Sequence, residues 1–402
     1  MFLGQPHNYF FFLSAAAILS LVIWGYLLVA RGAFWQTRRN TGMAQRQSEF
    51  PGLVAVIVPA RDEAEVVGEC VRSLLGQTGV PAIRVFLVDD ASTDRTAQVA
   101  RAAAEEAGRP ECLMILDGKP LAPGWSGKLW AVQQGVEKAV AAKPQFFLLT
   151  DADIVHSPDS IATLIAIAES GPYDLASFMV QLHCVTFAEK LLVPAFVFFF
   201  FMLYPPRWIA DPRRRTAGAA GGCILVRPEW LEQAGGVRAI RNEVIDDCAL
   251  AARVKSAGGR LWLGLTASAR SIRPYRTMGE MGRMISRTAF NQLRHSIWML
   301  LVSLLGLTLV YLAPPLLLLG HNRITRLFAL AAVLAMTAAY LPMVRFYRLG
   351  PLWALTLPVA AIFYMGATVH SAWKFWTGRG GEWKGRVQDP QGKPVGGQTS
   401  PP

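Results

Sequence analysis

Long uncharged runs at the two ends of this chain constrain its fold more than any other feature. Residues 1–30 contain no Asp, Glu, Lys or Arg, and 10–30 is an apolar stretch of about the 20 residues that a membrane-crossing helix needs. Three further uncharged runs, each long enough to cross a bilayer, occupy 297–320, 327–344 and 349–373. Only 17% of the 402 residues are charged, against about 25% in ordinary soluble domains, so part of the chain belongs in lipid.

These runs predict four parts. We expect an N-terminal transmembrane anchor at 1–30, a central domain at 31–296, about three transmembrane or re-entrant helices at 297–373, and a basic, partly disordered tail at 374–402. A cleaved signal peptide is the alternative for 1–30. It is disfavoured because the basic segment that starts such a peptide is missing and no clear small-residue cleavage site follows.

Basic residues set the expected orientation. Arg31, Arg38, Arg39 and Arg46 directly follow the first run, and such residues stay on the cytoplasmic side of a membrane. We therefore expect a multi-pass protein of the cytoplasmic (inner) membrane whose central domain faces the cytoplasm. Three C-terminal crossings would leave the basic tail outside, so either one run is re-entrant or the tail departs from the rule. The five cysteines, odd in number and without Cys-x-x-Cys spacing, indicate reduced thiols, as expected in the cytoplasm.

The net charge of +12 raises the question of a nucleic-acid partner. No helix-turn-helix, zinc-finger or aromatic RNA-binding pattern accompanies this charge, so we expect no nucleic-acid binding. Lys and Arg beside membrane-crossing segments are attracted to acidic headgroups by about 1 kcal/mol each. The expected partner of the positive charge is therefore the membrane surface.

Alternating strand and helix patterns predict an α/β central domain with a mostly parallel sheet. Apolar runs suited to strands lie at 53–59, 83–88, 113–116 and 146–150. Helical patterns lie at 65–75, 92–107 and 127–141. Such βα units require parallel strands with right-handed crossovers, and ligands bind at the carboxyl ends of those strands.

Two acidic pairs lie at such strand ends. Asp89 and Asp90 end the second strand; because Ser92 and its neighbours can cap the next helix, these carboxylates are available to a uracil ring or ribose. Asp151 and Asp153 follow the fourth strand, where their oxygens can hold Mg²⁺ or Mn²⁺ together with a phosphate. The sequence therefore predicts a nucleotide site and a metal site at one edge of the sheet.

Two more segments fit this site. In 124–128, Gly-Trp-Ser-Gly-Lys, a loop enters a helix, so backbone N–H groups and Lys128 converge where a diphosphate can bind, although the P-loop spacing is absent. Asp246 and Asp247 open an amphipathic stretch after a Gly-rich segment and a strand at 223–226. One acid would suffice as a helix cap, and a hydroxyl acceptor needs a general base. Because we expect two adjacent acids on a helix not to share a pocket, only one is assigned.

The uncharged stretch at 191–206 lies inside the central domain and is short for a membrane crossing. A buried core helix is one interpretation. Trp208 and the arginines at 213–215 that follow favour a helix at 187–209 lying in the membrane interface, where it can present a lipid acceptor.

Five motifs in this order resemble the inverting glycosyltransferases of the GT-A type. They are VIVPARDEAEVVGECVRSLL, FLVDDASTDRT, GWSGKLWAVQQG, LLTDAD and VIDDCALAARVKSAGG, spread over about 50–300. That family includes ceramide glucosyltransferase, polyprenyl-phosphate sugar transferases, cellulose synthase and the bacterial hopene-associated glycosyltransferases. The resemblance implies a Rossmann-like GT-A domain and transfer of a sugar from a nucleotide diphosphate donor, UDP-glucose or UDP-N-acetylglucosamine, to a lipid acceptor such as a hopanoid.

The resemblance also implies roles for individual residues. Asp247, the second acid of its motif, is the catalytic base, and Asp151 and Asp153 hold the metal. Gly221 and Gly222 lie against the acceptor. The residues implied to contact the donor are Pro59, Arg61, Glu63, Asp89, Asp90, Lys128, Asp151 and Arg287.

One family feature departs from the pattern. The Gln-x-x-Arg-Trp motif of processive synthases is not intact; the chain reads MISRTAFNQLRHS, in which Arg287 is the best-placed cation and Arg294 the reserve. This loss favours a single transfer over processive polysaccharide synthesis, which stays an alternative. A non-catalytic membrane protein that binds a nucleotide sugar is a second alternative, disfavoured because all the required carboxylates are present. A transporter is disfavoured because the apolar runs carry almost no polar groups.

Overall fold

The computed structural model describes residues 6–37, 49–377, 382–383 and 386–387. The chain divides into two compact units. The helical unit comprises Met1–Arg39, Leu182–Thr216 and Pro274–Trp373, and the α/β unit comprises Asn40–Gln181, Ala217–Arg273 and Lys374–Pro402. By this division 182–216 and 274–296, which the sequence analysis includes in the central domain, group with the helical unit.

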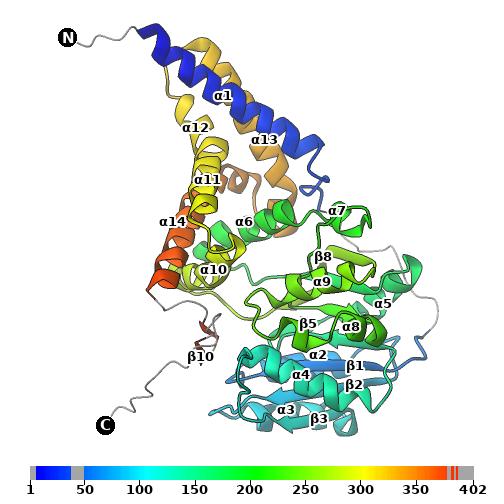
Figure 1. The fold of residues 1–402 in the computed structure, drawn as a ribbon. Coiled ribbons are helices and arrows are strands. Elements are labelled where there is room, and N and C mark those ends of the chain that lie inside the picture. Colours follow the sequence, from blue (N-terminus) through cyan, green and yellow to red (C-terminus); the bar gives the residue numbers. More distant parts are fainter. Residues whose placement is uncertain (1–5, 38–48, 378–381, 384–385, 388–402) are drawn as a thin grey trace, which may run out of the picture. The chain divides into compact units, whose positions relative to one another are not determined.

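The α/β unit is built on an eight-stranded sheet with the order β3-β2-β1-β4-β7-β6-β8-β5 (Figure 1). The strands are β1 Val54–Ala60, β2 Ile83–Asp89, β3 Leu113–Asp117, β4 Phe146–Leu149, β5 Ile154–His156, β6 Leu175–Gln181, β7 Ile224–Val226 and β8 Leu261–Ser271. The pairs β1–β2, β1–β4, β2–β3 and β6–β8 are parallel, and β4–β7, β6–β7 and β5–β8 are antiparallel. The sheet is therefore mixed and mostly parallel, as the sequence predicts, with a Rossmann-like half at β1–β4.

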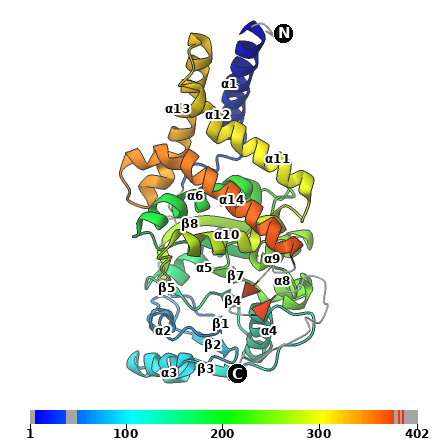
Figure 2. The same cartoon turned by 90° about the vertical axis from the view of Figure 1, so that its left-hand side faces the viewer.

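Helices cover both faces of the parallel half. They are α2 Val67–Leu75, α3 Thr96–Glu106 and α4 Gly127–Val140, and in Figure 2 α2 and α3 lie on one side of β1–β3 and α4 on the other. All seven residues of β1 are buried, as expected for a strand covered on both faces. Gly135 of α4 allows close packing, because a Cβ there would lie 2.6 Å from Cγ2 of Ile57. The core thus fixes the carboxyl ends of β1, β2 and β4 beside one another.

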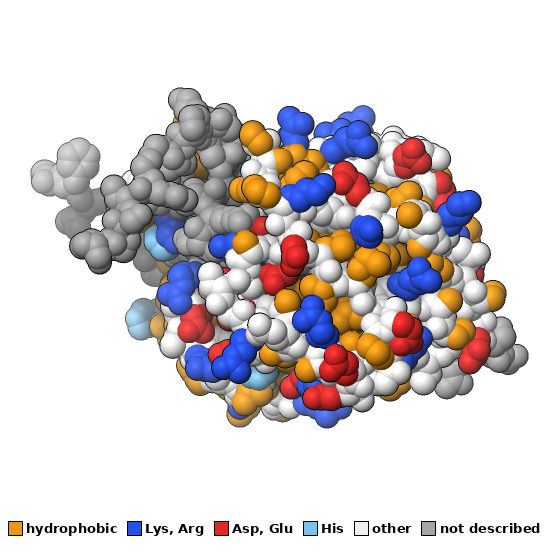
Figure 3. Space-filling model, turned by 90° about the horizontal axis from the view of Figure 1, so that it is seen from below, with side chains coloured by type: hydrophobic (Ala, Val, Ile, Leu, Met, Phe, Trp, Pro, Cys, Tyr) orange, Lys and Arg blue, Asp and Glu red, His pale blue; other side chains and the backbone are white. Residues whose placement is uncertain are grey.

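The first of the remaining helices of the α/β unit precedes the parallel strand β3, and the others precede or follow strands of the antiparallel half. They are η1 Pro110–Cys112, α5 Ser160–Ser170, α8 Pro228–Gln233, η2 Val237–Ile240 and α9 Asp246–Ser256, and Glu382–Trp383 pairs with Arg386–Val387 as β9 and β10. The surface seen in Figure 3 carries basic and acidic side chains interspersed with apolar ones. Such a mixture is typical of protein surface in contact with water.

The helical unit contains the apolar runs. Its elements are α1 Pro6–Val29, α6 Phe187–Leu203, α7 Pro206–Ala210, α10 Met278–Gln292, α11 Ile297–Leu307, the π-helical turn η3 Thr308–Leu312, α12 Ala313–Leu317, α13 Arg323–Phe346, η4 Pro351–Thr356 and α14 Leu357–Trp376. Within the described part of the chain, five helical segments are long and apolar enough to cross a membrane. Four match the runs found in the sequence, and the fifth is Phe187–Ala210.

This fifth segment is mostly covered by its own unit. A capping box formed by Thr186 and Glu189 starts α6, and the Tyr364 hydroxyl donates a hydrogen bond to the carbonyl of Leu192 over 3.0 Å. The ring of Phe198 lies 5.2 Å from that of Tyr340. These contacts belong to the core-helix interpretation, and placement of 187–209 in the membrane interface stays a prediction.

Aromatic and basic residues follow this helix. The guanidinium groups of Arg31 and Arg214 lie 4.6 and 4.8 Å from the centre of the Trp208 ring. Arg31 comes just after α1, so the ends of two apolar segments meet at this indole. Such stacking is favourable because the face of an aromatic ring attracts cations.

Candidate functional site

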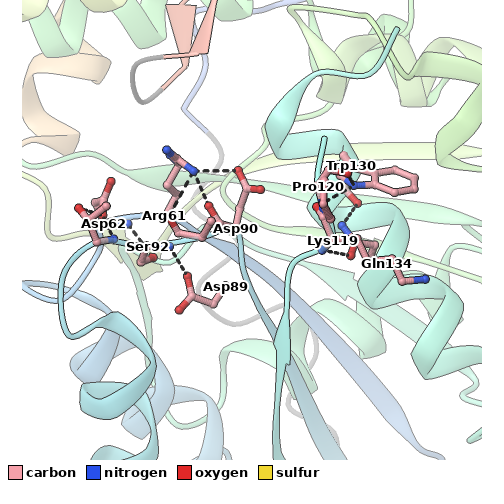
Figure 4. Close-up of polar contacts among 11 residues, drawn as sticks. Arg61, Asp62, Asp89, Asp90, Ser92, Lys119, Pro120, Trp130 and Gln134 are labelled. Atoms are coloured by element: carbon pink, nitrogen blue, oxygen red, sulfur yellow. Dashed lines mark hydrogen bonds and ion pairs between the residues drawn. The ribbon is translucent and has the colours of Figure 1, made fainter. Parts of the chain in front are cut away.

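Loops that follow two neighbouring parallel strands form the first part of the site (Figure 4). The register of β1 and β2 sets Ala60 opposite Asp89, so Arg61 and Asp90 come next at the carboxyl edge. Arg61 donates a hydrogen bond to the Asp90 carbonyl, and its Nη1 lies 3.7 Å from Oδ2 of that residue. Asp90 is 1% exposed. The guanidinium group of Arg61 therefore lies beside a carboxylate that is almost fully buried.

Backbone strain accompanies these two loops. Asp62 and Ala91 both have a positive φ, of 50° and 54°, which is unusual for residues other than glycine. The loops hold each other, because the Asp62 N–H donates to the Ser92 hydroxyl and Asp62 Oδ1 accepts from the Thr93 N–H. Asp89 Oδ1 accepts from the Ser92 N–H over 2.9 Å, so this acid shapes the loop. Its predicted contact with the nucleotide stays a prediction.

The loop after β3 closes against the same place. A Cβ at Gly118 would lie 2.8 Å from the Asp89 carbonyl oxygen, so this position requires glycine. The Lys119 N–H donates to Gln134 Oε1 over 2.8 Å, and the Trp130 indole N–H donates to the Lys119 carbonyl (Figure 4). Two α4 side chains therefore fix the loop that leads to Lys128.

The ammonium group of Lys128 contacts two carboxylates that come from different sequence motifs. Its Nζ lies 2.9 Å from Oδ1 of Asp151, just after β4, and 3.3 Å from Oδ2 of Asp246, the first residue of α9. Ser126 caps α4 by accepting from the Leu129 N–H, which fixes the turn that carries Lys128. Sequence analysis names all three charged residues but does not predict that they pair.

Electrostatics favour the charged form of Lys128. Partial burial opposes the ammonium form of Lys128, but the charges of Asp151 and then Asp246 outweigh it and raise the Lys128 pKa above its ordinary value. Partial burial, opposed by Lys128 and supported by the Asp153 charge, raises the pKa of Asp151. The ammonium group of Lys128 therefore offsets the negative charge of the two carboxylates that it contacts.

Asp247 is held by backbone donors. Its Oδ2 accepts from the Gly221 N–H over 2.8 Å, and its Oδ1 accepts from the Cys248 N–H over 2.7 Å. Burial, and then the charge of Asp246, raise the pKa of Asp247 to about 6. The expectation that only one of Asp246 and Asp247 faces the pocket is wrong, because both line it. They stand at the first turn of α9, after Ile245 at φ −107° and ψ 70°, where the chain is only entering the helix.

The last residue of β8 and a residue just after that strand complete the cluster around Asp153. The Ser271 hydroxyl donates to Asp153 Oδ2 over 2.6 Å, and Arg273 Nε lies 3.5 Å from the same oxygen. Arg273 also forms an ion pair with Glu63 from the first loop. Sequence analysis missed Ser271 and Arg273. A hydroxyl group and a cationic side chain at the end of β8 were the signal that could have found them, but that strand was not predicted.

One pocket connects Lys128 with the carboxylates of Asp151, Asp246 and Asp247. Its polar rim includes Lys128, Asp151, Asp246, Asp247 and the bare backbone of Gly221. The rest of the lining is mostly apolar and consists of Pro59, Leu129, Val132, Leu149, Thr150, Ile224, Val237, Ile240 and Leu250. Apolar walls reduce solvent screening, so charges on the rim act more strongly on a bound ligand.

Asp151 and Asp153 suit a hard divalent cation only when a bound ligand supplies further oxygen atoms. Asp151 and Asp153 each engage one oxygen as described, which leaves Oδ2 of Asp151 and Oδ1 of Asp153 without a hydrogen bond within 6–37 and 49–377. Among the residues whose placement is described, no group of three or more His, Cys, Asp or Glu is arranged to hold a metal. Mg²⁺ typically takes one or two carboxylates plus substrate phosphates, so this donor set suits a cation that arrives with a diphosphate.

Not every predicted residue comes to this pocket. Pro59, Lys128, Asp151, Gly221 and Asp247 line it. Gly222 packs behind it, where a Cβ would lie 3.0 Å from Cγ2 of Val180. Arg287 lies exposed on α10 and Arg294 lies just after that helix, both in the helical unit. Their contact with the donor stays a prediction.

Comparisons with known proteins agree with the fold and the motifs. Residues 55–235 match the family model "Glycosyl transferase family 2". The chain is 27% identical over 243 residues to the 4,4'-diaponeurosporenoate glycosyltransferase of Staphylococcus aureus (strain USA300), covering 58% of this chain and 59% of that protein. The chain thus spans less than two thirds of the length of that relative.

A solved structure shows the same fold. The mannosyltransferase PcManGT from Pyrobaculum calidifontis, in complex with GDP-Man and Mn²⁺, superposes with a TM-score of 0.53 at 17% identity, covering 90% of this chain and 99% of that one. Staphylococcus aureus TarS 1–349 in complex with UDP-GlcNAc gives 0.39 at 14% identity, covering 81% and 92%. Residues 55–235 are therefore similar to family 2 glycosyltransferases, and the α/β unit has the GT-A fold.

Proposed function

We propose that this protein is a membrane-bound inverting glycosyltransferase that moves a hexosyl group from a nucleotide diphosphate sugar to a lipid acceptor. The observation that carries the proposal is the single pocket that joins Lys128, Asp151, Asp246 and Asp247 at the carboxyl edge of the sheet. The five apolar helices of the helical unit support a membrane location. We place the protein in the cytoplasmic membrane with the α/β unit on the cytoplasmic side.

The donor is proposed to bind across the parallel half of the sheet. Arg61 and Asp90 hold the nucleoside, and Lys128 contacts the diphosphate. UDP-glucose and UDP-N-acetylglucosamine are the proposed donors. Asp151 and Asp153 would hold Mg²⁺ or Mn²⁺, which offsets the charge that grows on the departing diphosphate.

Asp247 is proposed to act as the base. The acceptor hydroxyl attacks the anomeric carbon from the side opposite the diphosphate, the carbon–oxygen bond to the phosphate breaks, and the hydroxyl proton passes to a carboxylate oxygen of Asp247. The backbone N–H groups of Gly221 and Cys248 hold that carboxylate in one orientation. A base fixed in this way needs no reorganisation before the proton transfer.

The acceptor is proposed to be a lipid that carries a hydroxyl group, a hopanoid among them. The apolar helices give such an acceptor a hydrophobic phase to arrive from. The Staphylococcus aureus relative is named for 4,4'-diaponeurosporenoate. A single transfer is favoured over polymer synthesis because the chain lacks an intact Gln-x-x-Arg-Trp motif.

The proposal is tested by transfer into lipid. Purified protein in lipid nanodiscs is incubated with Mn²⁺, radiolabelled UDP-glucose, UDP-N-acetylglucosamine or GDP-mannose, and a bacterial lipid extract, and label is counted in the organic phase. We expect label from one donor with the wild type and with Asp117→Asn, an exposed acid at the end of β3, but none with Asp247→Asn. Label in an insoluble polymer would overturn lipid transfer, and donor binding without any product would overturn catalysis.

A further inference from the structure

The ammonium group of Lys128 stands where it competes with a divalent cation. It lies 2.9 Å from Oδ1 of Asp151, one of the two carboxylates assigned to the metal. A cation that approaches this carboxylate meets a positive charge already paired with it. Because like charges at such distances repel, cation and ammonium cannot both hold the same oxygen.

Lys128 also pairs with a second carboxylate, that of Asp246, which is not one of the two assigned to the metal. Asp246 Oδ2 lies 3.3 Å from the same Nζ, and it comes from α9 rather than from the β4 end. If Lys128 leaves Asp151, Asp246 keeps the ammonium group at the pocket rim. Asp246 is therefore a positioning residue for Lys128.

The surroundings leave the lysine room to move. The side chains of Lys128, Asp151 and Asp246 are 22%, 35% and 24% exposed, so the bridge is open to water and not sealed in the core. A Cβ at Gly221 would lie 3.5 Å from Nζ of Lys128, so the ammonium group faces bare backbone on that side. Neither burial nor a neighbouring side chain at Gly221 locks it against Asp151.

We propose that Lys128 is an exchangeable internal cation: it neutralises Asp151 while the donor is absent, and it moves to the diphosphate when a divalent cation takes that carboxylate. This inference rests on the metal and donor sites of the proposed function. Lys128 thus opposes binding of the cation alone and favours binding of the cation together with a nucleoside diphosphate. The α/β unit then captures its metal with the donor, which agrees with a protein donor set too small to hold a metal alone.

The exchange predicts opposite effects on two binding equilibria, that of Mn²⁺ alone and that of the nucleoside diphosphate. In the full-length protein in nanodiscs, Mn²⁺ binding is followed by the electron paramagnetic resonance of free Mn²⁺, first alone and then with UDP or GDP. We expect Lys128→Met and Lys128→Gln to bind Mn²⁺ alone more tightly and to bind the nucleoside diphosphate at saturating Mn²⁺ more weakly, each by about tenfold, the effect of one charge-assisted contact. Lys138→Met removes an exposed lysine in the last turn of α4, and we expect it to change neither equilibrium.

A double-mutant cycle tests the role of Asp246. If Asp246 acts by keeping Lys128 at the rim, Asp246→Asn weakens diphosphate binding in the wild type but has a much smaller effect in the Lys128→Met background. Equal effects in both backgrounds would overturn the positioning role. Unchanged thermal midpoints check that the variants fold.

Other outcomes decide against the exchange. Weaker binding of both Mn²⁺ alone and the diphosphate would make Lys128 only a general support of the site, and no change in Mn²⁺ affinity would make it only a diphosphate ligand. Failure of the wild type to bind Mn²⁺ even with UDP and GDP would overturn the metal assignment and the exchange together. The assay contains no acceptor, so failed lipid transfer leaves its result valid.

Discussion

The backbone N–H of Gly221 donates a hydrogen bond to Oδ2 of Asp247 over 2.8 Å, so a residue without a side chain orients the carboxylate assigned as the base. A Cβ at Gly221 would lie 3.5 Å from this oxygen and from Nζ of Lys128, which is ordinary van der Waals contact. The space beside Asp247 and Lys128 is therefore open at Gly221. A methyl group there would fit into the folded chain without a clash.

We expect Gly221→Ala to fold normally but to lower the transfer rate by about tenfold, because the methyl group occupies space that the acceptor needs; misplacement by about 1 Å can cost even more. Gly222→Ala is the matched control, since its Cβ would lie 3.0 Å from Val180 and 3.3 Å from Ile154. Overpacking of this kind costs about 1–3 kcal/mol of stability. Thermal unfolding midpoints report the loss of stability expected for Gly222→Ala. Initial transfer rates in nanodiscs report the loss of activity expected for Gly221→Ala. Full activity in Gly221→Ala would show that the acceptor does not approach there.

Asp247→Asn and Asp153→Ala should fail in different steps. Loss of the base lowers kcat by about 10²–10⁴-fold while donor binding persists. Loss of Asp153 removes a cation ligand, so donor binding itself weakens and loses its dependence on Mn²⁺. Isothermal titration with UDP in the presence and absence of Mn²⁺, followed by rate measurements, checks both. Wild-type turnover in Asp247→Asn would show that the base is a different residue.

The pH dependence of transfer should report Asp247. Because burial and Asp246 raise its pKa to about 6, kcat/KM should rise with unit slope below that pH and level off above it. For stability the sign is the reverse, since the ordinary value of 3.8 is lower: the contribution of Asp247 is full below pH 3.8 and is lost as the pH rises through about 6. Asp246→Asn removes the repelling charge, so the midpoint should move to lower pH. A midpoint unchanged by that substitution would argue against titration of Asp247.

His156, buried at 3% exposure in β5, should make the α/β unit sensitive to acid. The Thr150 hydroxyl donates to the Gly222 carbonyl over 2.8 Å, so the His156 Nε2–H donates to Thr150 Oγ1 in the neutral imidazole. Burial lowers the His156 pKa from 6.5 to about 4. The folded state thus resists protonation, and we expect a loss of up to about 3 kcal/mol as the pH falls from 6.5 to 4.

The difference between wild type and His156→Gln isolates the stability lost on protonation of His156, because glutamine keeps an N–H donor but does not titrate. Thermal unfolding at pH 7 and pH 4.5 should show a larger drop for the wild type than for the variant. Equal drops would mean that other groups account for the acid sensitivity.

The parallel half of the sheet is readable from sequence because its strands are continuous apolar runs. β1 was expected at 53–59 and lies at Val54–Ala60, and β2 was expected at 83–88 and lies at Ile83–Asp89. The acids that follow these runs mark the carboxyl edge. The antiparallel half is harder. A strand expected at 223–226 matches β7 at Ile224–Val226, but β5 has only three residues, too few for a strand pattern to be detected.

Contacts between distant side chains account for most of what sequence analysis missed in the site. Lys128 and Asp246 pair across 118 positions of the chain, and Arg273 reaches Glu63 across 210. No local pattern encodes such a pair; the register of β1 with β2 and β4, and of β8 with β5, creates it. The burial of α6 among helices of its unit was one of two interpretations that the sequence left open, because an apolar stretch alone does not show what covers it.

The edge position of β5 has a consequence for biosynthesis. β5 directly follows Asp153 and pairs with β8, which also supplies Ser271 and the Ile272 N–H that donates to the Asp153 carbonyl. A nascent chain therefore exposes Asp151 and Asp153 long before β8 leaves the ribosome, and the apolar helix α6 is made in between. Until residue 273 has been synthesised, the second carboxylate has neither its strand partner nor its serine and arginine. The order of synthesis thus delays assembly of the proposed cation site until α6 has already emerged.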